Sequence, residues 1–111
     1  MRLYGLRRNS IDVVEALAGQ RAGRLVIVDV REARERARGF VSGSEHVPLG
    51  QLKHRLGELP KDCPVAFICQ SGRRSALAAT AARRAGVDAR NVAGGMNAWE
   101  RKGLELDRET A

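Results

Sequence analysis

The strongest fold signal in this sequence is Val65-Ala66-Phe67-Ile68-Cys69-Gln70-Ser71-Gly72-Arg73-Arg74-Ser75. Its first five residues form a continuous apolar run, which is typical of a strand buried on both faces of a parallel sheet. A short loop containing Gly72 follows. From Ser75 to Ala85 the alanine-rich sequence predicts a helix that ends at Gly86. The stretch therefore predicts a strand, a tight loop and a helix, which is the repeating unit of an α/β domain.

The rest of the chain alternates the same two kinds of element. We expect further strands at Leu25–Val30, Glu45–Val47 and Asn91–Ala93, and a weaker first strand at Leu3–Gly5. We expect helices from a Ser10 N-cap to Gly19, over Glu32–Arg38, over Leu49–Leu59 before Pro60, and over Met96–Lys102 before Gly103. With 111 residues and no repeat or linker, the sequence predicts one α/β domain over residues 1–111.

The composition is that of an ordinary globular protein. Apolar residues make up 43% of the chain and charged residues 30%, which argues against overall disorder. The sequence has no apolar run of about 18 residues, so no membrane span is expected. The first eight residues lack the apolar centre of a signal peptide, so a cytoplasmic location is expected.

The net charge of +7 has two interpretations. One is attraction of anions, such as nucleic acid or a small anionic substrate. The other is solvated charge without a partner. The basic residues are spread along the chain with few aromatic residues between them for base stacking. This spread favours the second interpretation, and nucleic acid is not an expected partner.

The two cysteines, Cys63 and Cys69, lie at opposite ends of the predicted strand. At about 3.3 Å per residue, six steps separate their Cα atoms by roughly 20 Å. A disulfide requires Cα atoms within about 7 Å of each other. We therefore expect no disulfide between them, and Cys63 has no neighbours that suggest chemistry.

Cys69 is the candidate nucleophile. Ligands of parallel α/β sheets bind beyond the carboxyl ends of the strands, and Cys69 is expected at such an end. The loop N–H groups, the start of the helix, and Arg73 and Arg74 would lower the pKa of this thiol. A free cysteine at the end of a strand is often only a core residue. The loop and helix that follow favour the thiolate, which is the attacking form.

Four segments of the chain together resemble the single-domain rhodaneses, which are thiosulfate sulfurtransferases. They are C-x-x-G-x-R-S at Cys69–Ser75, D-V-R-x-x-x-E at Asp29–Glu35, the G-H-I-x-G-A…N-I-P segment at Gly39–Pro48, and G-G-x-x-x-W at Gly94–Trp99. Phe40 stands where the family usually has His, and His46 where it usually has Asn. The resemblance implies a three-layer α/β/α rhodanese-like domain around a mainly parallel sheet of about five strands.

The resemblance also implies a reaction. The Cys69 thiolate would take sulfur from an anionic donor such as thiosulfate and form a persulfide. It would then pass the sulfur to cyanide, a thiol or an acceptor protein. The expected substrate-binding residues form the loop, namely Gln70, Ser71, Gly72, Arg73, Arg74 and Ser75. Loop N–H groups would hold the terminal sulfur, the two arginines would attract the donor, and Ser75 would donate to the thiolate. No cofactor is expected.

Other residues in these segments have expected structural roles. Asp29 and Arg31 could pair to fix the turn after a strand. Gly94 and Gly95 would allow a close backbone approach or a positive φ. Trp99 would anchor the last helix in the core. The two histidines, His46 and His54, lie outside any cluster of ligand residues, so no metal site is expected.

Three other functions remain open at this point. Cysteine phosphatases and arsenate reductases also use a thiolate, but they typically place Arg six positions after Cys, where this chain has Ser75. The sequence also offers no identifiable acid for the leaving oxygen. A non-catalytic rhodanese-like binding module often lacks the cysteine that this chain keeps. A nucleic-acid binder would suit the charge, but no recognised RNA-binding motif supports it.

Overall fold

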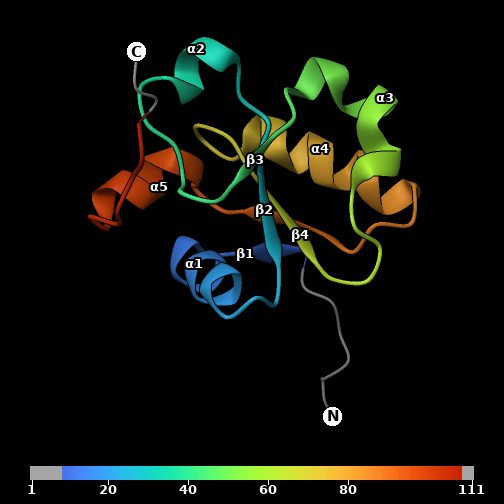
Figure 1. Ribbon diagram of the computed structural model, residues 1–111, viewed down its shortest axis with the longest axis horizontal. Coiled ribbons are helices and arrows are strands. Elements are labelled where there is room, and N and C mark those ends of the chain that lie inside the picture. The colour runs from blue at the N-terminus through green and yellow to red at the C-terminus, as the bar shows by residue number, and fades with distance from the viewer. Residues whose placement is uncertain (1–8, 109–111) are drawn as a thin grey trace.

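The computed structural model describes residues 9–108, and a five-stranded sheet forms its centre (Figure 1). The strands are β1 (Ser10–Ile11), β2 (Val26–Asp29), β3 (Glu45–His46), β4 (Val65–Ile68) and β5 (Ala89–Val92). Their order is β1-β5-β4-β2-β3, and all neighbouring strands are parallel. The helices are α1 (Val13–Arg21), α2 (Ala33–Arg36), α3 (Leu52–Arg55), α4 (Arg73–Arg84) and α5 (Gly95–Arg101).

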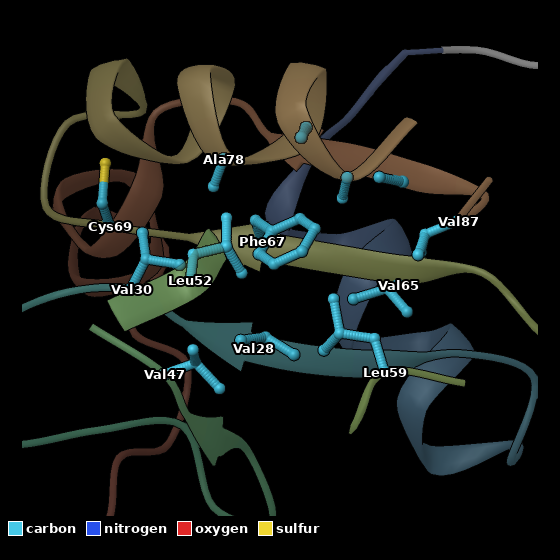
Figure 2. Close-up of a cluster of buried hydrophobic side chains, with 13 residues drawn as sticks. Val28, Val30, Val47, Leu52, Leu59, Val65, Phe67, Cys69, Ala78 and Val87 are labelled. Carbon is cyan, nitrogen blue, oxygen red and sulfur yellow. The ribbon is translucent and has the colours of Figure 1, made fainter. Parts of the chain in front are cut away.

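Helices cover both faces of the sheet. One buried apolar cluster joins β2 and β4 to α3 and α4, and a second joins the opposite face to α1 and α5 (Figure 1). Phe67 lies in the first cluster (Figure 2), and Trp99 lies in the second. Both side chains are fully buried. The three-layer α/β/α architecture is therefore confirmed, and so is the role of Trp99 in anchoring the last helix.

The alternation of side chains along β4 determines which way Cys69 faces. Successive residues of a strand point to opposite faces of the sheet. Val65 and Phe67 pack on the α4 side, whereas Ala66 and Ile68 pack on the α1 and α5 side. Cys69 follows the same alternation, and its side chain lies on the α4 side. The first turn of α4 is on that face.

The first strand and the first helix differ from expectation. Ser10 belongs to β1, and the N-cap of α1 is Asp12, which forms a capping box with Glu15. Asp12 Oδ1 accepts the Glu15 N–H at 2.8 Å, and the Glu15 carboxylate accepts the Asp12 N–H at 3.2 Å. Two strand residues carry too little periodicity to be recognised from sequence. The expected strand at Leu3–Gly5 lies outside the described residues.

Two expected helices also have different boundaries. Residues 49–59 form a 3₁₀ turn at Leu49–Gln51, then α3, then a second 3₁₀ turn at Leu56–Glu58. Glycine is a poor helix former, and Gly50 and Gly57 interrupt this segment. Helix α1 continues past Gly19 to Arg21. A Cβ atom at Gly19 would lie 2.6 Å from Leu25 Cδ2, so this glycine serves close packing and does not end the helix.

The expected pair of Asp29 and Arg31 is confirmed at the end of β2. Asp29 Oδ2 accepts from Arg31 Nη2 at 2.9 Å, and Asp29 Oδ1 accepts the Arg31 backbone N–H at 3.0 Å. Arg36 adds a second cation at 3.4 Å from Asp29 Oδ2. Arg31 Nη2 also donates to the Gly39 carbonyl at 2.8 Å. Because Asp29 is fully buried, these partners are what make its charge tolerable there.

Gly95 has a φ of +55°, and its backbone lies against the Cys69 loop. A Cβ atom at this position would touch the Cys69 carbonyl oxygen and lie 2.8 Å from the Gln70 carbonyl oxygen. Gly95→Ala should lower the free energy of unfolding by about 3 kcal/mol or more, because backbone strain adds to a clash with atoms that cannot move aside. Urea denaturation measures this change.

Gly86→Ala is the matched control. Gly86 has a φ of +90°, but no atom lies within 4 Å of its potential Cβ. Only the cost of the left-handed conformation remains, about 1–2 kcal/mol. Equal costs for the two substitutions would show that the close approach at Gly95 is unimportant.

Candidate active site

The sulfur of Cys69 is surrounded by hydrogen-bond donors. Cys69 directly follows β4, and its Sγ lies 3.1 Å from the Gly72 backbone nitrogen and 3.3 Å from the Ser75 backbone nitrogen. The hydroxyl oxygen of Ser75 also lies 3.3 Å from Sγ. In Figure 2 the sulfur points away from the apolar side chains and toward the start of α4. Cys69 is therefore packed beside the core while its sulfur faces polar groups.

The sulfur also takes the place of a helix cap. The N-cap residue of α4 is Gly72, with a φ of 102° and no side chain to accept the free N–H groups of the first turn. The N–H at the third helical position, Ser75, points instead to Cys69 Sγ. The helix N-terminus adds partial positive charge near the sulfur. Anionic sulfur is therefore favoured at this place.

Two opposing effects act on the pKa of Cys69. Burial raises this pKa because it disfavours the charged form. Hydrogen bonds from the Ser75 hydroxyl and from the backbone N–H groups of Ser75, Gly72 and Ser71 lower it. The donors outweigh burial, so the pKa of the thiol lies below its ordinary value. The arrangement favours a thiolate, which is the nucleophilic form of cysteine.

The start of α5 holds the loop from its other side. The N–H of Met96 donates to the Cys69 carbonyl at 2.8 Å, and the N–H of Asn97 donates to the Gln70 carbonyl at 3.0 Å. Gln70 Nε2 donates to Asn97 Oδ1 at 2.7 Å. Both Gly94 and Gly95 have positive φ, so the expectation for this pair is confirmed. Asn97 was missed in the sequence because it occupies a variable position of the G-G-x-x-x-W segment.

The two loop arginines have different surroundings. Arg74 forms a two-pronged ion pair with Glu35, with both contacts at 2.8 Å. The hydrogen bonds from Arg74 lower the pKa of Glu35 to about 2, although partial burial opposes them. Arg73 is exposed, and its side chain forms no hydrogen bond or ion pair with residues 9–108. The positive charge of Arg74 is thus balanced by a carboxylate, whereas that of Arg73 is not.

The predicted loop residues therefore divide into three groups. Gly72 and Ser75 contact the sulfur directly, and the Ser71 backbone N–H contributes to its environment. The side chains of Gln70 and Arg74 turn to Asn97 and Glu35. The side chain of Arg73 faces solvent.

A pocket of about 670 Å³ borders this loop at Gln70. Its wall carries positive charge from three arginines and negative charge from two glutamates, namely Arg31, Arg38, Arg108, Glu35 and Glu100. Cys69 does not line the pocket and has no exposed surface. A reactant can therefore reach the sulfur only when atoms around it move aside.

The two family-pattern departures have local roles. His46 Nε2 lies 2.8 Å from the Arg31 carbonyl oxygen. The Cζ atom of Arg36 lies 4.2 Å from the centre of the Phe40 ring. The backbone of Phe40 pairs with that of Asp107 in an antiparallel bridge. Both departures thus support the region around Asp29 and not the sulfur itself.

Residues 9–108 contain neither a disulfide nor a cluster of metal-ligand side chains. Both cysteines are free, which confirms that Cys63 and Cys69 do not bridge. No group of three or more His, Cys, Asp or Glu side chains in this range could hold a metal ion. Nor is any helix there long and apolar enough to cross a membrane.

Several known proteins resemble this chain in sequence or in structure. The chain is 38% identical over 76 residues to "Putative sulfurtransferase YtwF" of Bacillus subtilis, a match covering 68% of this chain and 74% of that protein. It is 39% identical over 79 residues to "Putative sulfur carrier protein YrkF" of the same organism, covering 70% of this chain. That match covers only 43% of YrkF, so the chain spans less than half of that relative.

The solved structures agree with the fold. The crystal structure of a rhodanese-related protein from Thermoplasma volcanium matches with a TM-score of 0.85 at 27% identity, covering 92% of this chain and 100% of that one. The family model described as "Rhodanese-like domain" matches residues 12–102, from the N-cap of α1 to the end of α5. On this match and on the fold around Cys69, the chain belongs to the rhodanese-like domain family.

Proposed function

We propose that this chain is a sulfurtransferase that carries sulfane sulfur as a persulfide on Cys69. The observation that carries the proposal is the sulfur position, 3.1 Å from the Gly72 N–H nitrogen and 3.3 Å from that of Ser75, at the start of α4. The name of the relative YtwF supports sulfur transfer as the reaction class.

The first half-reaction loads the enzyme. The Cys69 thiolate attacks the outer sulfur of an anionic donor such as thiosulfate. The bond between the two donor sulfurs breaks, and its electron pair leaves with sulfite. The terminal sulfur of the persulfide carries the negative charge, and loop N–H groups from Gln70 to Arg74 would stabilise it.

The second half-reaction unloads the enzyme. A thiophilic acceptor, such as cyanide, a thiolate or the thiolate of an acceptor protein, attacks the terminal sulfur. The sulfur–sulfur bond of the persulfide breaks, and its electron pair returns to Cys69 as the thiolate. The donors that favour ionised Cys69 make it a good leaving group in this step.

The two arginines contribute differently to donor binding. Arg73, which is exposed and unpaired within residues 9–108, is the cation available to attract a dianion. Arg74 is held by Glu35 and fixes the loop to α2. Arg74 is therefore proposed as a residue that shapes the loop, with a smaller part in donor binding than Arg73.

The position of Ser75 favours sulfur over phosphorus as the transferred atom. Six residues after the cysteine, a phosphatase of this type has an arginine that clamps phosphate. Here Ser75 occupies that position, is fully buried, and contacts Cys69 Sγ with both its N–H and its hydroxyl. This loop fits one additional sulfur atom better than a tetrahedral phosphate.

Replacement of the nucleophile tests the proposal directly. Incubation with thiosulfate should raise the intact mass of the protein by one sulfur atom, and cyanide should remove that mass. Cys69→Ala should abolish both the mass gain and sulfite release, because Cys63, the other free cysteine, lies outside the loop that would hold the persulfide. Cys63→Ser should retain both. A phosphoryl adduct formed from a phosphate ester would instead support the phosphatase alternative, and no adduct of either kind would support a binding module.

Replacement of the two arginines tests their separate roles. Arg73→Ala should raise KM for thiosulfate about fivefold, which corresponds to about 1 kcal/mol, with kcat nearly unchanged. Arg74→Ala should change KM less and lower the free energy of unfolding by about 1 kcal/mol, because it leaves a half-buried carboxylate unpaired. Arg84→Ala, an exposed site at the other end of α4, controls for net charge. Equal KM changes in all three variants would remove the specific role of Arg73.

The lowered pKa of Cys69 predicts how the reactivity of its thiol changes with pH. In the Cys63→Ser variant, alkylation by iodoacetamide reports Cys69 alone. The rate should rise with pH with a midpoint below that of an ordinary thiol, because the hydrogen-bond donors favour the thiolate over the thiol. The same variant unfolded in urea should return to the ordinary midpoint. A folded midpoint at or above the unfolded one would contradict the proposed stabilisation of the thiolate.

A further inference from the structure

A buried hydroxyl lies between the Cys69 sulfur and a side chain of the neighbouring strand. Ser75 Oγ is 3.3 Å from Cys69 Sγ and 2.5 Å from Oδ1 of Asn91 on β5. Ser75 has no exposed surface. Strand β5 lies directly beside β4, with Asn91 in register with Phe67. The three side chains therefore form a continuous polar chain from the sheet to the sulfur.

The hydrogen atoms of this chain determine its direction. A serine hydroxyl has one hydrogen to donate, and both a thiolate and an amide oxygen are acceptors. The Ser75 hydroxyl can therefore donate its hydrogen to Cys69 Sγ or to Asn91 Oδ1, but not to both at once. While the amide oxygen takes the hydrogen, Ser75 presents only lone pairs to the sulfur. Lone pairs suit a thiol, whose S–H can donate to them, but they disfavour a thiolate.

A half-turn of the Asn91 amide removes this conflict. The oxygen and nitrogen of an amide have nearly the same shape, so the turn exchanges Oδ1 and Nδ2 without a change in volume. Nδ2 would then donate to Ser75 Oγ, and the hydroxyl would be free to donate to Sγ. In its present position Nδ2 donates to no acceptor among residues 9–108. The half-turn therefore breaks one hydrogen bond in the chain and allows two.

We propose that Asn91 is a positioning residue whose amide turns Nδ2 toward Ser75 when Cys69 is ionised and so aims the Ser75 hydroxyl hydrogen at the sulfur. In the thiol state the order reverses, with S–H donating to Ser75 Oγ and the hydroxyl donating to Asn91 Oδ1. The same donor would serve the proposed persulfide. Only this last role rests on the proposed function, because the thiolate exists without a sulfur donor.

Asparagine suits this role because it can donate and accept with one shape. Aspartate has that shape but only accepts, so Asn91→Asp should hold the Ser75 hydrogen on the carboxylate and withhold it from Cys69. Its negative charge would also act on the thiolate through space. A second substitution, Ser75→Ala, separates the two effects because it removes the hydroxyl that connects them.

The experiment is a double-mutant cycle in the Cys63→Ser background. The Cys69 pKa is read from the pH dependence of iodoacetamide alkylation. Asn91→Asp should raise it by about one pH unit or more, the size expected for a lost hydrogen bond to a charged group. In the presence of Ser75→Ala, the same substitution should raise it by less than half as much. Equal shifts in both backgrounds, or no shift in either, would overturn the proposal.

A measurement on the wild-type side chain protects the test against a variant that does not fold. The nuclear magnetic resonance signals of the Asn91 Nδ2 hydrogens should shift with pH, with the midpoint found for Cys69 alkylation. In Ser75→Ala this coupled shift should disappear. The proposal would be overturned if these signals in the wild-type chain did not change over the pH range in which Cys69 titrates.

Both readouts are independent of sulfur transfer. If the coupling holds while thiosulfate leaves no adduct on Cys69, the proposed function fails and the role of Asn91 stands. If sulfur transfer occurs without the coupling, the role of Asn91 fails and the proposed function stands.

Discussion

The structure depends on the contact between the Cys69 sulfur and the first turn of α4. The helix begins at a glycine and has no side-chain oxygen to accept the Ser75 N–H, so the sulfur accepts it. Helix capping and thiolate stabilisation are therefore one interaction. The contact exists because the alternation along β4 places Cys69 on the same face as α4. A shift of one residue in the strand would direct the thiol to the α1 and α5 layer.

The surrounding elements hold the loop at fixed points. Helix α2 holds it through the pair of Glu35 and Arg74, and the start of α5 holds it through two backbone carbonyls. The turn between β2 and α2 is itself fixed by Asp29, which is fully buried with two arginine partners. These supports come from the segments that resemble the family pattern. These segments are far apart in the sequence, but the fold brings them together at the carboxyl ends of the strands.

The sequence allowed prediction of the features that repeat a pattern or use distinctive residues. Strands β2 and β4 were recognisable as apolar runs, and Cys69 was recognisable from the loop and helix that follow. Strand β1 was not recognisable because two residues cannot show a period. Arg73 and Arg74 look equivalent in the sequence, because Glu35 meets Arg74 only through the fold. The sequence indicates Asn91 only as part of a strand, because its partner Ser75 lies on a different element.

The backbone contacts between α5 and the loop impose an order on biosynthesis. The N–H groups of Met96 and Asn97 hold the carbonyls of Cys69 and Gln70, and Gly95 fits against the same carbonyls. A ribosome adds residues 95–97 only after it has added the cysteine and its loop. A nascent chain halted between these points carries the thiol without the contacts that α5 makes with its loop. The surroundings of the thiol are therefore completed only when a later part of the chain has been translated.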